Sequence, residues 1–470
     1  KTAFSMQIDP MTFDKTSMDT SDLDIQHEND NADTNKESIG TEEQCLFESE
    51  NVDLCKENIS TENQCSFEYP TLFCNKTLLE LCNASWSSSP MKRPDVQPYL
   101  RGCKWSPDGT CCLTVVNNDG VHIEELPVDL YSGEVTKTRP RNLLDSVVHV
   151  KEAGLVYDFC WYPAMNSHNP ESCCWITTMQ NAPIQMWDGF NGSLRSSYRG
   201  FDSVDEMETG LSVTFSDDGS KIIGGYKKCL RTFDVNRPGR EYAEHKISSP
   251  ASCLATDGNH LAVGSWNTSI SLYKMNEIGT YKSTGKMHGH GGGVTHMKFA
   301  ANGLLLVSGA RKDNRLLVWD LRHHRKPLNI LTRVVDTNQR VYFDISPCGN
   351  YLVSGGSDGI LRVWDMRQIN WHTTFPLHND CCNSVSIHPL RPIMATGSGQ
   401  YHFTDPIKTI DAEDKCEYDV KTKAEQDDLE SNMNMENDVN NINKGDMKYS
   451  SCTDNSLVFW WTGDIPDLLS

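Results

Sequence analysis

The chain has 470 residues, of which 37% are hydrophobic, 9% aromatic and 23% charged. It contains no run of about 20 apolar residues, which argues against a membrane-spanning helix. Its first ten residues, KTAFSMQIDP, lack the basic and apolar regions of a signal peptide. The formal net charge is −21, which by itself argues against a nucleic-acid-binding surface unless the acidic residues are concentrated elsewhere.

The acidic residues are indeed concentrated in two segments. Residues 1–90 carry 18 acidic and 5 basic side chains, and residues 401–450 carry 13 and 6. Residues 91–400 carry 30 acidic and 32 basic side chains and are therefore nearly neutral. Residues 1–90 are also rich in Asn, Ser and Thr, so they cannot bury enough apolar surface to fold alone. We interpret 1–90 as a disordered acidic tail and 404–450 as a disordered acidic insertion.

From Tyr99 onward a pattern of strands and turns recurs. Each copy has an apolar strand, a turn with Gly beside Asp or Asn, a second apolar strand, a polar turn, and a third strand ending in Trp-Asp or a relative. The clearest copies begin at Val294 (VTHMKFAANGLLLVSGARKDNRLLVWDLR) and Val341 (VYFDISPCGNYLVSGGSDGILRVWDMR). The last copy lacks its third strand until NSLVFWW at Asn455, beyond the acidic insertion.

The spacing of these copies predicts an all-β fold. Successive first strands are separated by 39–56 residues, at or above the 40–45-residue period of WD40 repeats. Seven copies fit a closed, seven-bladed WD40 β-propeller over residues 91–465, with the insertion 404–450 inside the last blade. The aligned first strands place these residues in register: Trp105, Trp161, Phe215, Leu254, Phe299, Ile345 and Ile387.

One set of polar residues in the copy at Val294 resembles a catalytic triad. WD40 blades use such a set as a buried relay, in which Asp contacts His, His contacts Ser, and the hydroxyl contacts Trp. A nucleophile needs access to its substrate, whereas these residues are predicted to lie between blades. We therefore assign a structural relay, and no catalytic role, to His290, Ser308, Asp313 and Trp319.

The sequence predicts no cofactor and no metal site. The 18 cysteines include no CxxC pair, and HExxH motifs and phosphate-binding loops are absent. Together with the lack of a signal peptide, this favours reduced, buried thiols.

The turns after each second strand, and the links into each following repeat, are expected to emerge on one face of the ring. Four basic side chains, a glutamine and a tryptophan are predicted there, and Arg340 adds a fifth positive charge. Lys and Arg neutralise phosphate, while Trp and Arg stack on unpaired bases, so this mixture suits single-stranded RNA. A scaffold that binds peptides through the same turns remains an alternative, and an enzyme built on a propeller is a second one. We call this set the predicted rim: Lys227, Lys228, Trp266, Arg311, Lys312, Gln339 and Arg340.

Nine strings, in order over about 310 residues, are more specific than the WD40 pattern. By these strings the chain resembles the telomerase Cajal body protein 1 family. They are GCKWSPDG (from Gly102), YDFCWY (Tyr157), IQMWDGFNGSLR (Ile184), NRPGR (Asn236), SGARKD (Ser308), TNQRVYFD (Thr337), SVSIHP (Ser384), ATGSGQ (Ala395) and the closing Trp460-Trp461.

The resemblance implies a non-enzymatic adaptor in the nucleus. It implies recognition of the CAB-box loop of small Cajal-body RNAs, with telomerase RNA as a further client where it is present. It also implies that the ribonucleoproteins are retained in Cajal bodies, in support of telomere maintenance. The implied partners are these RNAs, ribonucleoprotein and Cajal-body proteins, and a cytosolic chaperonin for folding, with no membrane and no small-molecule substrate. By resemblance RNA contact falls on Arg311, Lys312, Gln339 and Arg340, whereas Lys227, Lys228 and Trp266 rest on their expected place in the propeller. The alternative is a WD40 protein–protein interaction scaffold without direct RNA binding.

Overall fold

A computed structural model describes most of residues 72–464. The described ranges are 72–73, 77–86, 97–152, 154–276, 280–368, 372–402 and 454–464. They contain 29 strands and two short 3₁₀ segments, η1 (Val128–Ser132) and η2 (Pro170–Ser172). Among the described residues no helix is long and apolar enough to cross a membrane. The predicted insertion 404–450 and most of the predicted tail lie outside the described residues.

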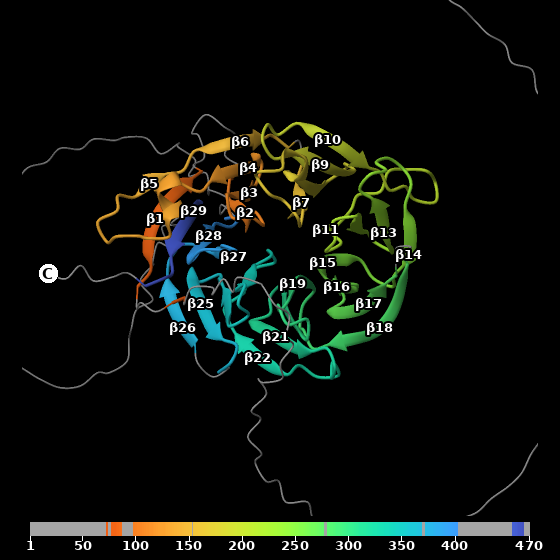
Figure 1. The fold of residues 1–470 in the computed structure, drawn as a ribbon. Coiled ribbons are helices and arrows are strands. Elements are labelled where there is room, and N and C mark those ends of the chain that lie inside the picture. Colours follow the sequence, from red (N-terminus) through yellow and green to blue (C-terminus); the bar gives the residue numbers. More distant parts are fainter. Residues whose placement is uncertain are drawn as a thin grey trace, which may run out of the picture. The chain divides into compact units, whose positions relative to one another are not determined.

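The strands form seven sheets arranged around a common centre (Figure 1). Blade 1 contains β2 (Leu100–Trp105), β3 (Cys111–Val116), β4 (Gly120–Glu125) and β6 (Ser146–Val150). Blade 2 contains β7 (Val156–Trp161), β8 (Cys174–Met179), β9 (Ile184–Asp188) and β10 (Leu194–Tyr198). Blade 3 contains β11 (Ser212–Phe215), β12 (Lys221–Gly225), β13 (Cys229–Asp234) and β14 (Ala243–Lys246).

The remaining blades repeat this antiparallel order. Blade 4 contains β15 (Ala251–Asp257), β16 (His260–Ser265), β17 (Ser269–Met275) and β18 (Tyr281–His288). Blade 5 contains β19 (Val294–Phe299), β20 (Leu305–Ala310), β21 (Arg315–Asp320) and β22 (Asn329–Thr332). Blade 6 contains β23 (Phe343–Ile345), β24 (Tyr351–Ser354), β25 (Ile360–Asp365) and β26 (His372–Pro376). Blade 7 contains β27 (Cys382–Ile387), β28 (Ile393–Ser398), β29 (Ser456–Trp461) and β1 (Leu79–Ser85), with β5 (Asn142–Leu143) added at its edge.

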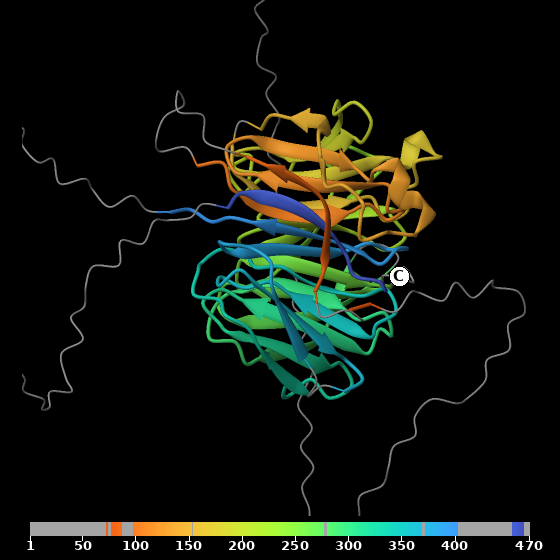
Figure 2. The same cartoon turned by 90° about the vertical axis from the view of Figure 1, so that its left-hand side faces the viewer.

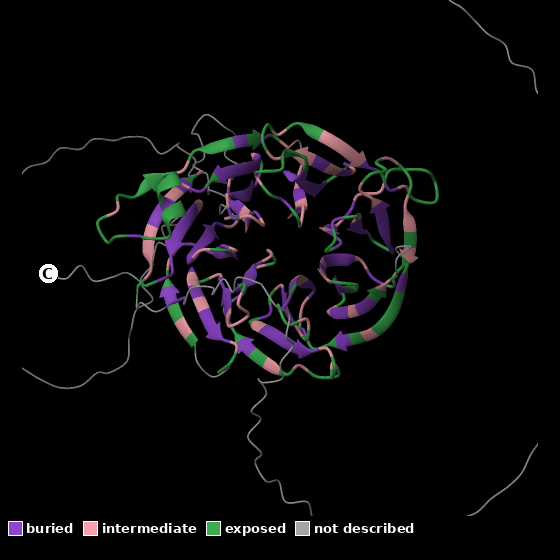
Figure 3. Ribbon diagram, in the orientation of Figure 1, coloured by how far each residue is buried: buried purple, intermediate pink, exposed green. Residues whose placement is uncertain are grey.

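The seven-bladed prediction is confirmed, and each of the seven residues aligned from sequence lies in the first strand of its blade. Second strands such as β3 and β28 are buried along their whole length because neighbouring blades cover both of their faces. Outermost strands such as β14 and β18 consist mostly of exposed and half-buried residues (Figure 3). The cores therefore lie between blades: Trp105 of blade 1, for example, packs with Phe459 of blade 7.

The propeller begins earlier than the predicted boundary at residue 91. β1 pairs antiparallel with β29, from Leu79 opposite Trp461 to Ser85 opposite Ser456. Figure 1 places these two strands, from opposite ends of the described chain, side by side, and Figure 2 shows the same pairing from the side. β1 thus supplies the outermost strand of blade 7, and residues 79–85 belong to the propeller and not to the tail. The pairing joins the two ends of the ring and covers the edge of β29.

Candidate functional site

The four relay residues of blade 5 are joined by hydrogen bonds. His290 Nδ1 lies 3.0 Å from Asp313 Oδ2, and its Nε2 lies 2.8 Å from Ser308 Oγ. Trp319 Nε1 donates to the same hydroxyl at 2.8 Å. Ser308 is fully buried, so its oxygen cannot meet a substrate. Burial alone would raise the pKa of Asp313, but hydrogen bonds from His290 and Arg315 hold it well below its usual range. This buried arrangement gives each of the four polar side chains a hydrogen-bond partner within blade 5.

A cavity of about 280 Å³ opens where the first strands of the blades begin, and we call it the entrance cavity. It brings together four residues of the predicted rim, which come from blade 4, blade 5 and the link into blade 6. Tyrosine and arginine side chains from blades 1 and 2 complete it, and no aspartate or glutamate is among the described residues that line it. The polar and aromatic lining residues are Tyr99, Arg101, Tyr157, Phe159, Ser252, Trp266, Thr295, Arg311, Asn338, Gln339, Arg340 and Tyr342.

A glycine-rich loop between β18 and β19 holds two of these side chains next to each other. Gly293 accepts a hydrogen bond from the backbone N–H of Arg311 at 3.0 Å. A Cβ atom on Gly293 would lie 3.0 Å from the carbonyl oxygen of Trp266 and 3.2 Å from Nε of Arg311. A Cβ atom on Gly292 would lie only 2.0 Å from the carbonyl oxygen of Arg311. Glycine is therefore needed here because the loop passes closely between the turns that carry Trp266 and Arg311.

Arg340, predicted to add a fifth positive charge to the rim, is paired with an acidic side chain. Its Nη1 donates to Asp158 Oδ1 at 2.7 Å and to the Tyr342 hydroxyl at 3.1 Å, and its Nη2 donates to the Ser252 carbonyl at 3.1 Å. Burial works against the guanidinium charge, but the ion pair with Asp158 outweighs it and raises the pKa of Arg340. Arg340 thus links blades 2 and 4 to the start of blade 6, and its charge is already balanced by a carboxylate.

Two other arginines supply the positive charge of the entrance cavity. Arg101, at the start of β2, donates from Nη1 to the carbonyl oxygen of Val156 at 2.8 Å. Burial, with a smaller contribution from nearby Arg340, lowers the pKa of Arg101. No carboxylate among the described residues lies within ion-pair distance of Arg101 or of Arg311. An anion that entered the cavity would therefore meet two guanidinium groups that form no ion pair with any acid in the described ranges.

Aromatic and amide groups complete the lining. Trp266 is 47% exposed although it is a large apolar side chain, and it stands at the edge of the cavity. Asn338 and Gln339 lie in the link into blade 6, and their side-chain amides offer both hydrogen-bond donors and acceptors. An exposed indole beside uncompensated guanidinium groups is the combination on which unpaired bases stack while phosphates are neutralised.

The three lysines of the predicted rim do not line the entrance cavity. Lys227 and Lys228 are exposed in the turn between β12 and β13 of blade 3. Lys312 is exposed beside Arg311 and has a φ of 49°, which turns the backbone away after Arg311. None of the three lines the cavity.

The opposite end of the channel has a different charge pattern. A cavity of about 510 Å³ lies there, lined by the last residues of the first strands. Its lysines are already engaged. Lys298 forms an ion pair with Asp344, and Lys104 donates to the Phe159 carbonyl at 2.6 Å and lies over the Phe159 ring. The entrance cavity is thus the better anion site of the two.

Sequence reasoning missed Arg101, Tyr157, Asn338 and Tyr342. Arg101 and Tyr157 are the second residues of β2 and β7, and in both blades the start of the first strand lines the entrance cavity. A large polar or charged side chain at the second position of a first strand was therefore the signal that could have found them.

The chain is similar to proteins of known family. The WD domain, G-beta repeat family matches residues 281–320 and 333–365. The telomerase Cajal body protein 1 homolog of Drosophila melanogaster is 40% identical over 398 residues, covering 82% of this chain and 69% of the fly protein. Telomerase Cajal body protein 1 of Homo sapiens is 37% identical over 347 residues, covering 70% of this chain and 61% of the human protein. A guanine nucleotide-binding protein negative regulator 1 of Schizosaccharomyces pombe is 25% identical over 312 residues, covering 62% of this chain and 77% of that protein. The chain belongs to the telomerase Cajal body protein 1 family.

Proposed function

We propose that the chain is a non-enzymatic RNA-binding adaptor whose entrance cavity holds a short single-stranded segment of RNA. The observation that carries this proposal is the meeting of Arg101 and Arg311, both without a carboxylate partner among the described residues, with the exposed Trp266. The guanidinium groups neutralise the backbone phosphates, and the indole stacks on one base. Asn338 and Gln339 hydrogen-bond base edges, which supplies discrimination between sequences.

Membership of the family supports a proposal for the RNA class. We propose that the ligand is the CAB-box loop of small Cajal-body RNAs, and of telomerase RNA where it is a client, because an unpaired loop can present a base to Trp266 and phosphates to the arginines of the cavity. The adaptor would then act in the nucleus and direct these ribonucleoproteins to Cajal bodies, in support of telomere maintenance. Ribonucleoprotein and Cajal-body proteins would bind elsewhere on the ring, and a cytosolic chaperonin would assist its folding.

Equilibrium binding of a CAB-box hairpin tests the site. Trp266→Ala is expected to weaken binding by about 1–3 kcal/mol, which is roughly 5- to 150-fold. Arg311→Glu is expected to weaken binding further and to make the salt dependence shallower, because one phosphate contact is lost. The paired change Lys227→Glu with Lys228→Glu reverses two exposed charges outside the cavity, as Arg311→Glu reverses one inside it, and it serves as the matched control.

Three outcomes separate the hypotheses. Loss of affinity in the cavity variants alone supports the proposal. Equal loss in the lysine control assigns RNA binding to the wider predicted rim and overturns the cavity assignment. If the wild-type protein binds the hairpin no better than a hairpin with a scrambled loop, the adaptor proposal fails and the scaffold that binds peptides becomes the better hypothesis.

A further inference from the structure

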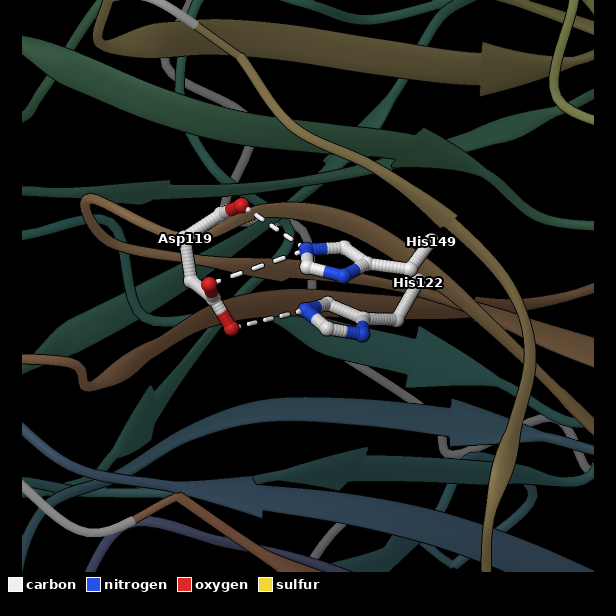
Figure 4. Close-up of side chains that lie close together, drawn as sticks. All are labelled: Asp119, His122 and His149. Atoms are coloured by element: carbon white, nitrogen blue, oxygen red, sulfur yellow. Dashed lines mark hydrogen bonds and ion pairs between the residues drawn. The ribbon is translucent and has the colours of Figure 1, made fainter.

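A second cluster of polar side chains lies at the outer edge of blade 1, on the opposite side of the blade from the entrance cavity's strand. Asp119 lies in the turn between β3 and β4, His122 on β4, and His149 on the outermost strand β6. His122 and His149 are directly opposite each other in the antiparallel pairing, so their side chains lie on the same face of the sheet. Figure 4 shows both imidazole rings pointing toward Asp119.

The atoms of this cluster are close enough to share one ion. His122 Nε2 lies 3.2 Å from Asp119 Oδ2, and His149 Nε2 lies 3.6 Å from Asp119 Oδ1. The three potential ligand atoms all lie within 4.8 Å of one another. In a tetrahedral zinc site, with metal–ligand bonds of about 2.0–2.2 Å, neighbouring ligand atoms are separated by roughly 3.3–3.5 Å. Each histidine therefore already lies near that distance from one oxygen of the Asp119 carboxylate, His122 from Oδ2 and His149 from Oδ1. His149 Nε2 also lies 3.0 Å from the Asp119 carbonyl oxygen, a contact that a metal ion would replace.

The remaining separation, between the two rings, needs only a small adjustment. The rings are stacked, with centroids 4.1 Å apart and an angle of 12° between their planes. His122 is held on its other side by Trp86, whose ring centroid is 5.5 Å away. His149 is exposed on the outermost strand and is the ring that can tilt toward a metal.

The buried side of His122 is prepared for a ligand role. Its Nδ1 lies 3.0 Å from Ser146 Oγ, and that hydroxyl donates to Glu124 Oε1 at 3.1 Å. With Nδ1 engaged by Ser146, Nε2 is the ring nitrogen that faces Asp119, 3.2 Å from its Oδ2. A chain from histidine through a hydroxyl to a carboxylate is the outer support that metal-bound histidines use.

We propose that Asp119, His122 and His149 form a binding site for a divalent transition metal ion, with Zn²⁺ as the ion that fits best. Two imidazoles and one carboxylate are a ligand set that suits zinc, and three protein ligands leave a fourth position for water or for a ligand from outside. Sequence motifs give no sign of this site because the two histidines lie on different strands, and β-pairing alone brings them together.

The test is titration of the full chain, freed of metal by a chelator and kept reduced, with Zn²⁺ in a calorimeter. One equivalent is expected to bind at this site. His149→Gln removes an exposed ligand without disturbing the core, and it is expected to weaken that binding at least tenfold. Ser146→Ala keeps all three ligands and is expected to weaken binding about 10- to 100-fold through loss of orientation. The matched control is His372→Gln, an exposed histidine on β26, the outermost strand of blade 6.

Cobalt substitution distinguishes this site from the thiols of the chain. Most of the cysteines in the described residues are buried, yet a thiol site would also take up zinc. Co²⁺ bound by nitrogen and oxygen shows visible d–d bands without the near-ultraviolet thiolate band, and this spectrum is expected for wild type and lost in His149→Gln. The proposal is overturned if no equivalent binds, if the bound cobalt shows the thiolate band, or if His149→Gln and His372→Gln bind metal like the wild type.

Discussion

The substitution Gly292→Ala tests how the glycine-rich loop builds the entrance cavity. The added Cβ would lie 2.0 Å from the carbonyl oxygen of Arg311, whereas real contacts of this kind begin at about 3.0 Å. The two backbones must therefore separate by roughly 1 Å. The neighbouring atom is backbone and not the end of a flexible side chain, so the turn that carries Arg311 must move as a unit, away from Trp266.

The displacement has two measurable effects. Overpacking of this kind costs about 1–3 kcal/mol of folding free energy, which lowers the midpoint of urea unfolding. Misplacing Arg311 relative to Trp266 is expected to weaken binding of a CAB-box hairpin by roughly 5- to 150-fold, the range for losing one stacked base. Fluorescence anisotropy with a labelled hairpin measures the second effect on protein that is still folded.

Gly291→Ala is the matched control, one residue earlier in the same loop. A Cβ atom there would lie 3.7 Å from the nearest atom, Nη2 of Arg315, which is an ordinary contact. Its unfolding midpoint and RNA affinity are expected to equal those of the wild type. If Gly291→Ala and Gly292→Ala behave alike in both assays, the close approach of the loop to Arg311 does not organise the site and the reasoning is wrong.

Three further predictions concern stability. Ser308→Ala leaves the buried Trp319 N–H without its acceptor and is expected to cost about 1–3 kcal/mol of unfolding free energy in urea, whereas Ser308→Thr, which keeps the hydroxyl, should cost less. Equal costs would contradict a role for the hydroxyl. The pKa of Asp313 is lowered in the folded protein, so the unfolded chain takes up the proton first and the free energy of unfolding falls as the pH drops below about 5. Asp313→Asn should be less stable than the wild type at pH 7, and its free energy of unfolding should decrease less between pH 7 and pH 4. An unchanged pH dependence would argue against the ion pair. Burial raises the pKa of Glu152 to about 7 from 4.5, so the stability of the wild type is expected to fall as the pH rises through that interval. Glu152→Gln should show a weaker dependence of unfolding free energy on pH in the same assay. Identical pH dependences would place the carboxyl in water.

The number of blades and the place of each first strand could be predicted because these features are local. Each repeat carries its own apolar strands and turns within about 40–55 residues, so periodicity alone marks it. β1 could not be found in this way. Its sequence LELCNAS lies among polar residues, and its partner β29 is encoded at the other end of the described chain. This short segment forms a strand because it pairs with β29 when the ring closes.

The candidate site could also be predicted only in part. The turns could be predicted from the sequence, and the turn residues Trp266, Arg311 and Gln339 do line one cavity. Ion pairs between blades could not be predicted from the sequence, so the neutralisation of Arg340 by Asp158, which lies in a different blade, appears only in the structure. Arg101 was missed for a related reason: its exposure to the channel depends on where β2 begins, and strand ends are the least certain feature of a sequence-based prediction.

The closure of the ring by β1 also sets the order in which the protein can be completed during translation. More than 370 residues separate β1 from β29. At about 5–20 residues per second, the ribosome needs roughly 20–75 seconds to make the second strand after the first. Throughout that interval β1 lacks its antiparallel partner β29, and the nascent propeller keeps an open strand edge that can pair with another chain. A nonsense codon between residues 377 and 455 would therefore leave six complete blades and a permanently open ring.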